Sequence, residues 1–202
     1  MTAPAARVVL VHGATGGPWT FGPWLPHLAG LDVRAVDLQE GLDIARATMA
    51  DYETAVTEAI GSTRAVVVGY SMGGLVALIA GRRRRLAGLV LLEPSVPLEV
   101  GGGDADVVPR PGTYGGGSGR HRPESLWAQG ERHRGISVPG VDCPLLVIAG
   151  RDFADTRGHA VVDRYGGELR AFPDVPHGLL ADDPGVIDAA TTWVRDALRP
   201  VA

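Results

Sequence analysis

The chain has no lysine and no asparagine, and it has only one cysteine among its 202 residues. All 19 of its basic residues are therefore arginine. Without lysine the chain has no Walker-A phosphate loop and no Schiff-base amine. Without asparagine it has no Cys-His-Asn site. The single cysteine, Cys143, allows neither an internal disulfide nor a cysteine zinc cluster, and we interpret it as a small buried apolar residue.

Long apolar runs and an excess of basic charge are also missing. No apolar run reaches the ~20 residues that span a bilayer, and the first ten residues have no signal-peptide pattern. We therefore expect a cytoplasmic protein that contacts no membrane. The formal net charge of -4 gives no reason to expect a nucleic-acid partner. The sequence leaves the oligomeric state open.

Short apolar segments alternate with longer amphipathic ones, which is the pattern of an α/β fold with parallel strands. The predicted strands cover residues 7–12, 33–37, 65–70, 89–92, 144–149 and 168–172. The predicted helices cover residues 19–28, 48–60, 72–84, 156–165 and 184–198. We expect a three-layer sandwich in which helices flank a mostly parallel sheet.

The composition changes between residues 94 and 141. Glycine runs at 101–103 and 115–117 flank a stretch with prolines and few aliphatic residues, which can bury little surface. We interpret 94–141 as a short glycine-rich lid inserted over the mouth of the sheet. The sixty or so residues that follow are too few for an α/β domain of their own, so we predict a single domain over 1–202.

The strongest chemical signal is Gly-Tyr-Ser-Met-Gly-Gly at residues 69–74. This G-x-S-x-G pattern follows an apolar run and opens an amphipathic segment, which is the strand-turn-helix context of a nucleophilic serine. The turn is so tight that side chains at the flanking glycines would collide with neighbouring elements. We expect Ser71 to present its hydroxyl at the positive end of a helix, where an anion is stabilised.

Two further segments surround this serine in the predicted fold. His12-Gly-Ala-Thr-Gly-Gly17 follows the first strand and can direct the N–H of Ala14 to the space above Ser71, where it would join the N–H of Met72 in an oxyanion hole. We interpret His12 as a structural support for this loop. The second segment is a Pro/Gly loop after the last strand, and it carries His177.

The glycine loop, the G-x-S-x-G turn and the late histidine together resemble the α/β-hydrolase superfamily, whose catalytic residues occur in the order Ser, acid, His. The resemblance covers the chain except the lid. It implies that Ser71 is the nucleophile and His177 the general base, and that Ala14 and Met72 donate to the oxyanion. It implies no metal and no cofactor. Trp19, just beyond the glycine loop, is a candidate substrate contact.

The triad acid is the element at which the sequence departs from the family pattern. In the family this acid usually stands three residues beyond a glycine, as G-x-x-D, after the strand that follows the lid. Here Phe153 occupies that position, with Asp152 one residue before it and Asp155 two residues after it. We favour Asp152 over Glu93, which ends the fourth strand, and over Asp155.

The resulting prediction is a cofactor-free serine hydrolase that cleaves a small or medium ester, thioester or lactone through an acyl-enzyme on Ser71. The displaced acid leaves a second hypothesis open, in which serine and histidine move protons in lyase, dehydratase or cyclase chemistry. A third hypothesis is a non-catalytic ligand-binding relative. Fold alone does not separate them, because function depends on the site.

Overall fold

A six-stranded sheet lies at the centre of the computed structural model, which describes residues 6–104, 109, 121–151 and 153–199. The strand order is β2-β1-β3-β4-β5-β6, and every neighbouring pair is parallel. The strands are β1 (Arg7–Val11), β2 (Asp32–Val36), β3 (Ala65–Tyr70), β4 (Gly88–Leu92), β5 (Leu145–Ala149) and β6 (Glu168–Ala171). The central strands are nearly all Val, Leu, Ile and Ala, because a parallel sheet is buried on both faces.

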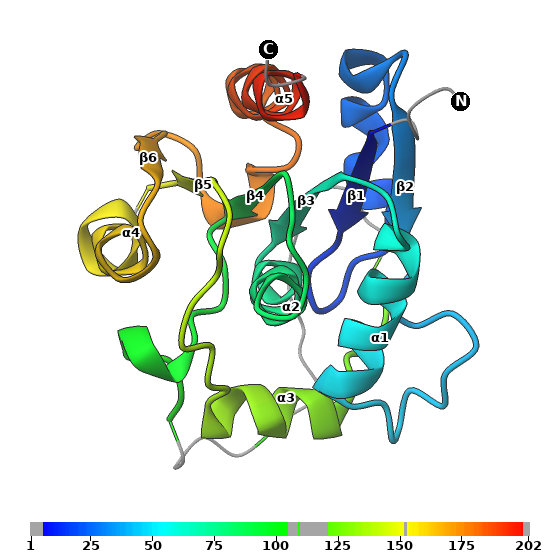
Figure 1. Cartoon of the computed structure of the whole chain (residues 1–202). Helices are drawn as coiled ribbons and strands as arrows, with labels where there is room; N and C mark the ends of the chain where they lie inside the picture. The colour runs from blue at the N-terminus through cyan, green and yellow to red at the C-terminus, as the bar shows by residue number, and fades with distance from the viewer. Residues whose placement is uncertain (1–5, 105–108, 110–120, 152, 200–202) are drawn as a thin grey trace.

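Helices cover both faces of the sheet (Figure 1). One face packs against α1 (Met49–Ile60), α2 (Met72–Gly81) and α4 (His159–Tyr165), and the other packs against α5 (Pro184–Leu198) and the 3₁₀ turns η1 (Pro18–Trp24) and η2 (Pro26–Leu28). Alternate residues of β1 face the two layers: Val9 and Val11 lie in the core with α2, whereas Val8 and Leu10 lie in the core with α5. The predicted three-layer α/β sandwich is confirmed.

Three predicted helices differ in detail from the observed ones. The helix expected over 72–84 ends at Gly81. The helix expected over 19–28 is two 3₁₀ turns, because Pro23 and Pro26 have no backbone N–H for an α-helical ladder. The helix expected over 156–165 begins earlier, as one turn of π-helix, η4 (Ala154–Gly158), and continues as α4.

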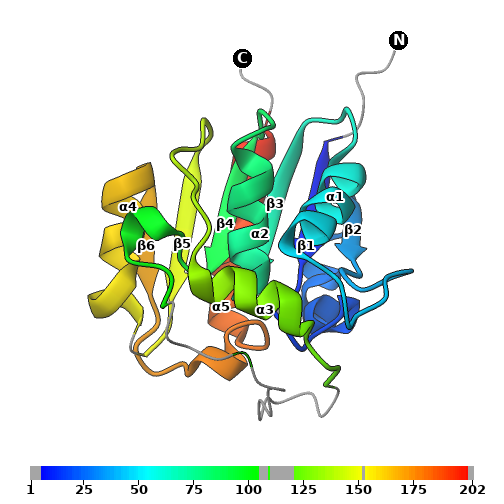
Figure 2. The ribbon, with the colours of Figure 1, turned by 90° about the horizontal axis from the view of Figure 1, so that it is seen from below.

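The segment 94–141 contains two elements that its composition did not predict: the 3₁₀ turn η3 (Leu98–Val100) and the helix α3 (Leu126–Arg134). Ser125 caps α3 by accepting the Ala128 N–H. Helix α3 lies across the ends of α2 and α1 (Figure 2). Residues 105–108 and 110–120 are outside the described part, so the lid stays a prediction.

None of the helices in the described part of the chain is both long and apolar enough to cross a bilayer.

Candidate active site

The carboxyl ends of four strands bring the candidate residues to one edge of the sheet. His12 follows β1, Ser71 follows β3, Glu93 follows β4 and Gly150 follows β5. The register of the parallel pairs places these strand ends side by side. The paired residues are Val11 with Gly69, Tyr70 with Leu92, and Leu92 with Ile148. This is the edge at which open α/β sheets bind their ligands.

Ser71 has the strained backbone that a tight strand-to-helix turn requires. Its φ of 54° and ψ of -119° lie in a region that L-residues rarely adopt. Neighbouring backbone holds it there: the Ser71 N–H donates to the Leu92 carbonyl at 2.9 Å, and its own carbonyl accepts the N–H groups of Gly74 and Ser95 at 2.9 Å each. The end of β4 therefore supports the turn directly.

The glycines around Ser71 are explained by close approaches of the backbone. A Cβ at Gly69 would overlap the carbonyl of Gly73, and one at Gly73 would overlap the carbonyl of Val11. A Cβ at Gly74 would lie 2.6 Å from the Cβ of Pro94. Three of the six residues in the motif are thus needed for packing of β3, α2 and β1, as the sequence predicts.

The glycine loop after β1 lies against this turn, and His12 supports it. A Cβ on Gly13 would be 3.3 Å from the Cβ of Ser71. The Leu38 N–H donates to His12 Nε2 at 3.1 Å, so the ring proton is on Nδ1, which donates to the Gly13 carbonyl at 2.7 Å. Burial lowers the pKa of His12 to about 4, which keeps it neutral. His12 is a structural support of this loop.

Ala14 and Met72, the predicted oxyanion donors, directly follow Gly13 and Ser71 in the chain. Ala14 follows Gly13 in a turn closed by the Gly16 N–H, which donates to the Gly13 carbonyl at 3.1 Å. Met72 is the first residue of α2, so its N–H has no partner within the helix. Trp19 lies further along, in η1, and is partly buried.

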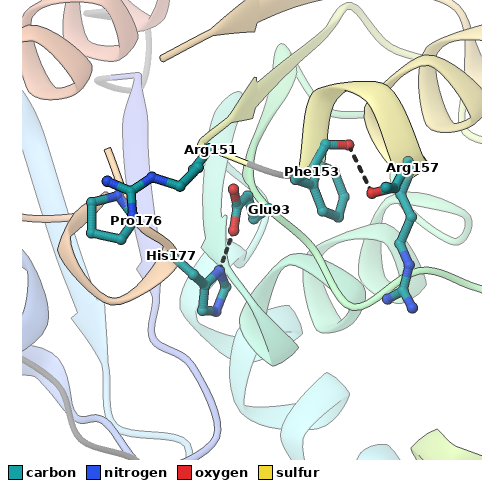
Figure 3. Close-up of a pocket in the computed structure, with 7 residues that line it drawn as sticks. Glu93, Arg151, Phe153, Arg157, Pro176 and His177 are labelled. Atoms are coloured by element: carbon teal, nitrogen blue, oxygen red, sulfur yellow. Dashed lines mark hydrogen bonds and ion pairs between the residues drawn. The ribbon is translucent and has the colours of Figure 1, made fainter. Parts of the chain in front are cut away.

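His177 opens the 3₁₀ turn η5 (His177–Leu179), and its Nδ1 is hydrogen-bonded to Glu93 Oε2 (Figure 3). A carboxylate can only accept, so Nδ1 carries the proton of the neutral ring and Nε2 is its acceptor nitrogen. The Gly150 N–H donates to Glu93 Oε1 at 2.6 Å. The Glu93 side chain is only 7% exposed, whereas that of His177 is 50% exposed. The acid is thus buried and the imidazole is accessible.

Tyr70, which precedes the candidate nucleophile, holds the histidine from its other side. Its hydroxyl donates to the His177 carbonyl at 2.7 Å, and the two ring centroids are 5.1 Å apart with the planes tilted by 30°. Burial, together with the negative charge of Glu93, raises the pKa of Tyr70, so the phenol stays a hydrogen-bond donor. The motif gives Tyr70 only as its variable position, and sequence reasoning missed this role.

Among the carboxylates that the structure describes, Glu93 is the one hydrogen-bonded to the His177 ring. Asp152, the acid favoured in the sequence analysis, lies outside the described residues and stays a prediction. The side chain of Asp155 is outside them too. One sequence feature could have favoured Glu93 as the acid. It directly follows a buried strand, β4, which lies next to the strand that leads to Ser71.

An open pocket of about 400 Å³ adjoins the His177–Glu93 pair (Figure 3). Its lining residues are Glu93, Arg151, Phe153, Thr156, Arg157, Pro176 and His177. Phe153, which takes the place of the aspartate in the G-x-x-D pattern, supplies an aromatic wall to this pocket. Within the described ranges, no three His, Cys, Asp or Glu side chains cluster as a metal site.

The profile of the alpha/beta hydrolase family matches residues 8–201, nearly the whole chain. The chain belongs to the alpha/beta hydrolase family, which confirms the resemblance. No curated protein matches it by sequence.

Solved structures with the same fold include an esterase, a thioesterase and a lipase-esterase related protein. A thermophilic esterase from Thermogutta terrifontis has a TM-score of 0.72 and 21% identity, over 98% of this chain and 92% of that one. The RedJ thioesterase of prodiginine biosynthesis in Streptomyces coelicolor has a TM-score of 0.69 and 21% identity, over 95% and 86%. A lipase-esterase related protein from Clostridium acetobutylicum has a TM-score of 0.69 and 14% identity, over 96% and 95%. At these identities the likeness concerns the fold alone.

Proposed function

We propose that this protein is a serine hydrolase that needs no cofactor and cleaves a small or medium ester, thioester or lactone. The observation that carries the proposal is the hydrogen-bonded His177–Glu93 pair at the same sheet edge as the strained Ser71. A nucleophile, a base and an orienting acid are the parts that acyl transfer requires. The esterases and thioesterases of the same fold support the same class of reaction.

The proposed reaction has two acyl-transfer steps. His177 Nε2 takes the proton of Ser71 as Oγ attacks the substrate carbonyl, and the Glu93 carboxylate stabilises the imidazolium that forms. The tetrahedral oxyanion accepts hydrogen bonds from the N–H groups of Ala14 and Met72. When the carbonyl re-forms, the bond to the leaving oxygen or sulfur breaks, and His177 returns the proton to that atom.

Deacylation repeats these steps with water as the nucleophile. His177 takes a proton from the water that attacks the acyl-enzyme, and it then protonates Ser71 Oγ as the acid product leaves. Net consumption is one water for each ester bond cleaved.

Glu93 is the acid in this proposal. Its burial, its second hydrogen bond from Gly150 and its contact with Nδ1 are the features that fix a histidine tautomer. A displaced acid is the motive for the lyase, dehydratase or cyclase alternative, and a carboxylate already in contact with His177 favours hydrolysis over it.

The substrate would lie between the Ser71 hydroxyl and the pocket beside His177. Ser71 is not among the residues that line this pocket, so the volume of about 400 Å³ would hold a substrate group beyond the reacting carbonyl, against the apolar ring of Phe153. Trp19 is the corresponding candidate contact on the side of the glycine loop.

The test is intact-mass analysis after treatment with a small fluorophosphonate. We expect one covalent adduct on the wild-type chain and none on Ser71→Ala, because only an activated serine hydroxyl reacts quickly. Ser62→Ala, at an exposed turn after α1, is the matched control and should keep the adduct. An unmodified wild-type chain would contradict the proposal and favour the proton-transfer or binding alternatives.

A further inference from the structure

Arg122 joins the segment before α3 to the glycine loop of the candidate active site. Its guanidinium forms a bidentate ion pair with Asp37, through Nη1 at 2.9 Å and Nη2 at 2.7 Å. Its Nε–H donates to the Gly16 carbonyl at 3.0 Å, and its backbone N–H donates to the Thr15 carbonyl at 3.0 Å. One residue thus binds two consecutive carbonyls of the loop that contains Ala14.

Two more contacts set the guanidinium in place. Its Cζ lies 4.9 Å from the centroid of the Trp19 ring, within cation–π range. Its Nη2 is 3.4 Å from Nε2 of the neutral, buried His12. Partial burial opposes the ionisation of Asp37, but the hydrogen bonds from Arg122 and from the Gln39 N–H outweigh it and hold the pKa of that carboxyl below its usual range. The ion pair therefore stays charged at neutral pH.

We infer that Arg122 is a positioning residue for the oxyanion hole, an inference that rests on the proposed hydrolase function. The loop is held at its start by His12, which donates to the Gly13 carbonyl, and at its end by Arg122, which binds the Thr15 and Gly16 carbonyls. The Ala14 N–H lies between these two supports. Arg122 touches no reacting atom, and it acts by fixing the direction of that N–H.

The same segment is anchored elsewhere, so it does not depend on Arg122 for its place. The Gln39 side-chain amide donates to the Pro123 carbonyl at 2.8 Å, and the Ser125 hydroxyl donates to the Ala47 carbonyl at 2.5 Å. The Met49 N–H donates to Glu131 at 2.7 Å. An alanine at position 122 keeps the backbone hydrogen bond to Thr15 but loses the bond to Gly16 and the ion pair with Asp37. It should therefore loosen the end of the glycine loop and leave α3 docked.

The test compares Arg122→Ala with Gln39→Ala, which breaks another link of this segment without touching the loop. With p-nitrophenyl acetate as probe, we expect Arg122→Ala to lower kcat about 10–100-fold with little change in KM, because a misplaced donor weakens only transition-state binding. Phenylboronic acid, which forms a tetrahedral adduct with an active serine, should bind more weakly in the same proportion. Gln39→Ala should keep both properties.

Asp37→Asn is the second variant, since it keeps the side-chain volume and removes the negative charge that faces Arg122. For this variant we expect a smaller fall in kcat, about 3–10-fold. In a separate rescue experiment, guanidinium ion added at millimolar concentration should partly restore the kcat of Arg122→Ala. If the wild-type chain forms the Ser71 adduct but Arg122→Ala and Asp37→Asn keep the wild-type kcat, the role of Arg122 is overturned and the proposed function stands. If wild-type chain forms no adduct and cleaves no ester, the proposed function and the inference fall together.

Discussion

His177 Nδ1 and Glu93 Oε2 are hydrogen-bonded although the two residues are 84 positions apart in the chain. Glu93 comes from the end of β4, and His177 comes from the loop beyond β6. Each partner has a further support: the Gly150 N–H binds the other Glu93 oxygen, and the Tyr70 hydroxyl binds the His177 carbonyl. The pair is thus held by three adjacent strand ends, β3, β4 and β5.

The first prediction separates the two carboxylates proposed as the acid. Glu93→Gln keeps the shape of the side chain but cannot stabilise an imidazolium, so kcat should fall by about 10²–10⁴. Asp152→Asn should change kcat less than about threefold. Steady-state hydrolysis of p-nitrophenyl acetate measures both variants. A larger loss in Asp152→Asn than in Glu93→Gln would return the assignment to Asp152.

Tyr70→Phe tests the support of His177. The variant keeps the ring contact but loses the hydrogen bond from the hydroxyl to the His177 carbonyl. We expect a loss of about 0.5–1.5 kcal/mol of unfolding free energy and a fall in kcat, since η5 would hold the imidazole less firmly. Urea unfolding and kinetics measure the two effects. Unchanged kcat would show that the imidazole is positioned by Glu93 alone.

Gly150→Ala tests the close packing behind Glu93. The added Cβ would overlap the Val175 carbonyl and lie 2.6 Å from Glu93 Oε1, so the backbone or the carboxylate must move. We expect a destabilisation of about 1–3 kcal/mol together with reduced kcat.

Gly22→Ala is the control for this substitution, because a Cβ at Gly22 has no neighbour within 4 Å. Its unfolding free energy should stay within about 0.5 kcal/mol of wild type. Equal melting temperatures for the two variants would contradict the packing argument.

The buried His12 predicts a loss of stability in mild acid. Its pKa is about 4 in the folded chain, because burial disfavours the charged ring, and 6.5 is the ordinary value. Below pH 6.5 the unfolded chain binds a proton that the folded chain does not, so stability falls as pH drops from about 6.5 toward 4. At pH 5 this loss is about 2 kcal/mol.

Urea unfolding at pH 7 and pH 5 measures this effect. His12→Gln has no titrating ring, so its loss of stability between these pH values should be about 2 kcal/mol smaller than that of wild type. His27→Gln, at an exposed position, should lose as much stability as wild type. An identical loss in His12→Gln would contradict the prediction.

The sequence alone determined the features that depend on short-range physics. Continuous apolar runs predicted the buried parallel strands, because a strand covered on both faces has no polar side. The glycines at 69, 73 and 74 predicted the tight turn, because close backbone approach excludes any Cβ. The strand-turn-helix context of Ser71 and the late position of His177 could be read in the same way.

Only the tertiary structure decided which distant groups meet at this edge of the sheet. The family spacing led to Phe153 and, beside it, to Asp152, but the carboxylate in contact with His177 comes from a neighbouring strand. Parallel pairing brings strand ends together regardless of their separation in the chain. The same reason explains Tyr70 and Arg122. Each binds a backbone carbonyl more than a hundred positions away, and no local pattern of residues records such a contact.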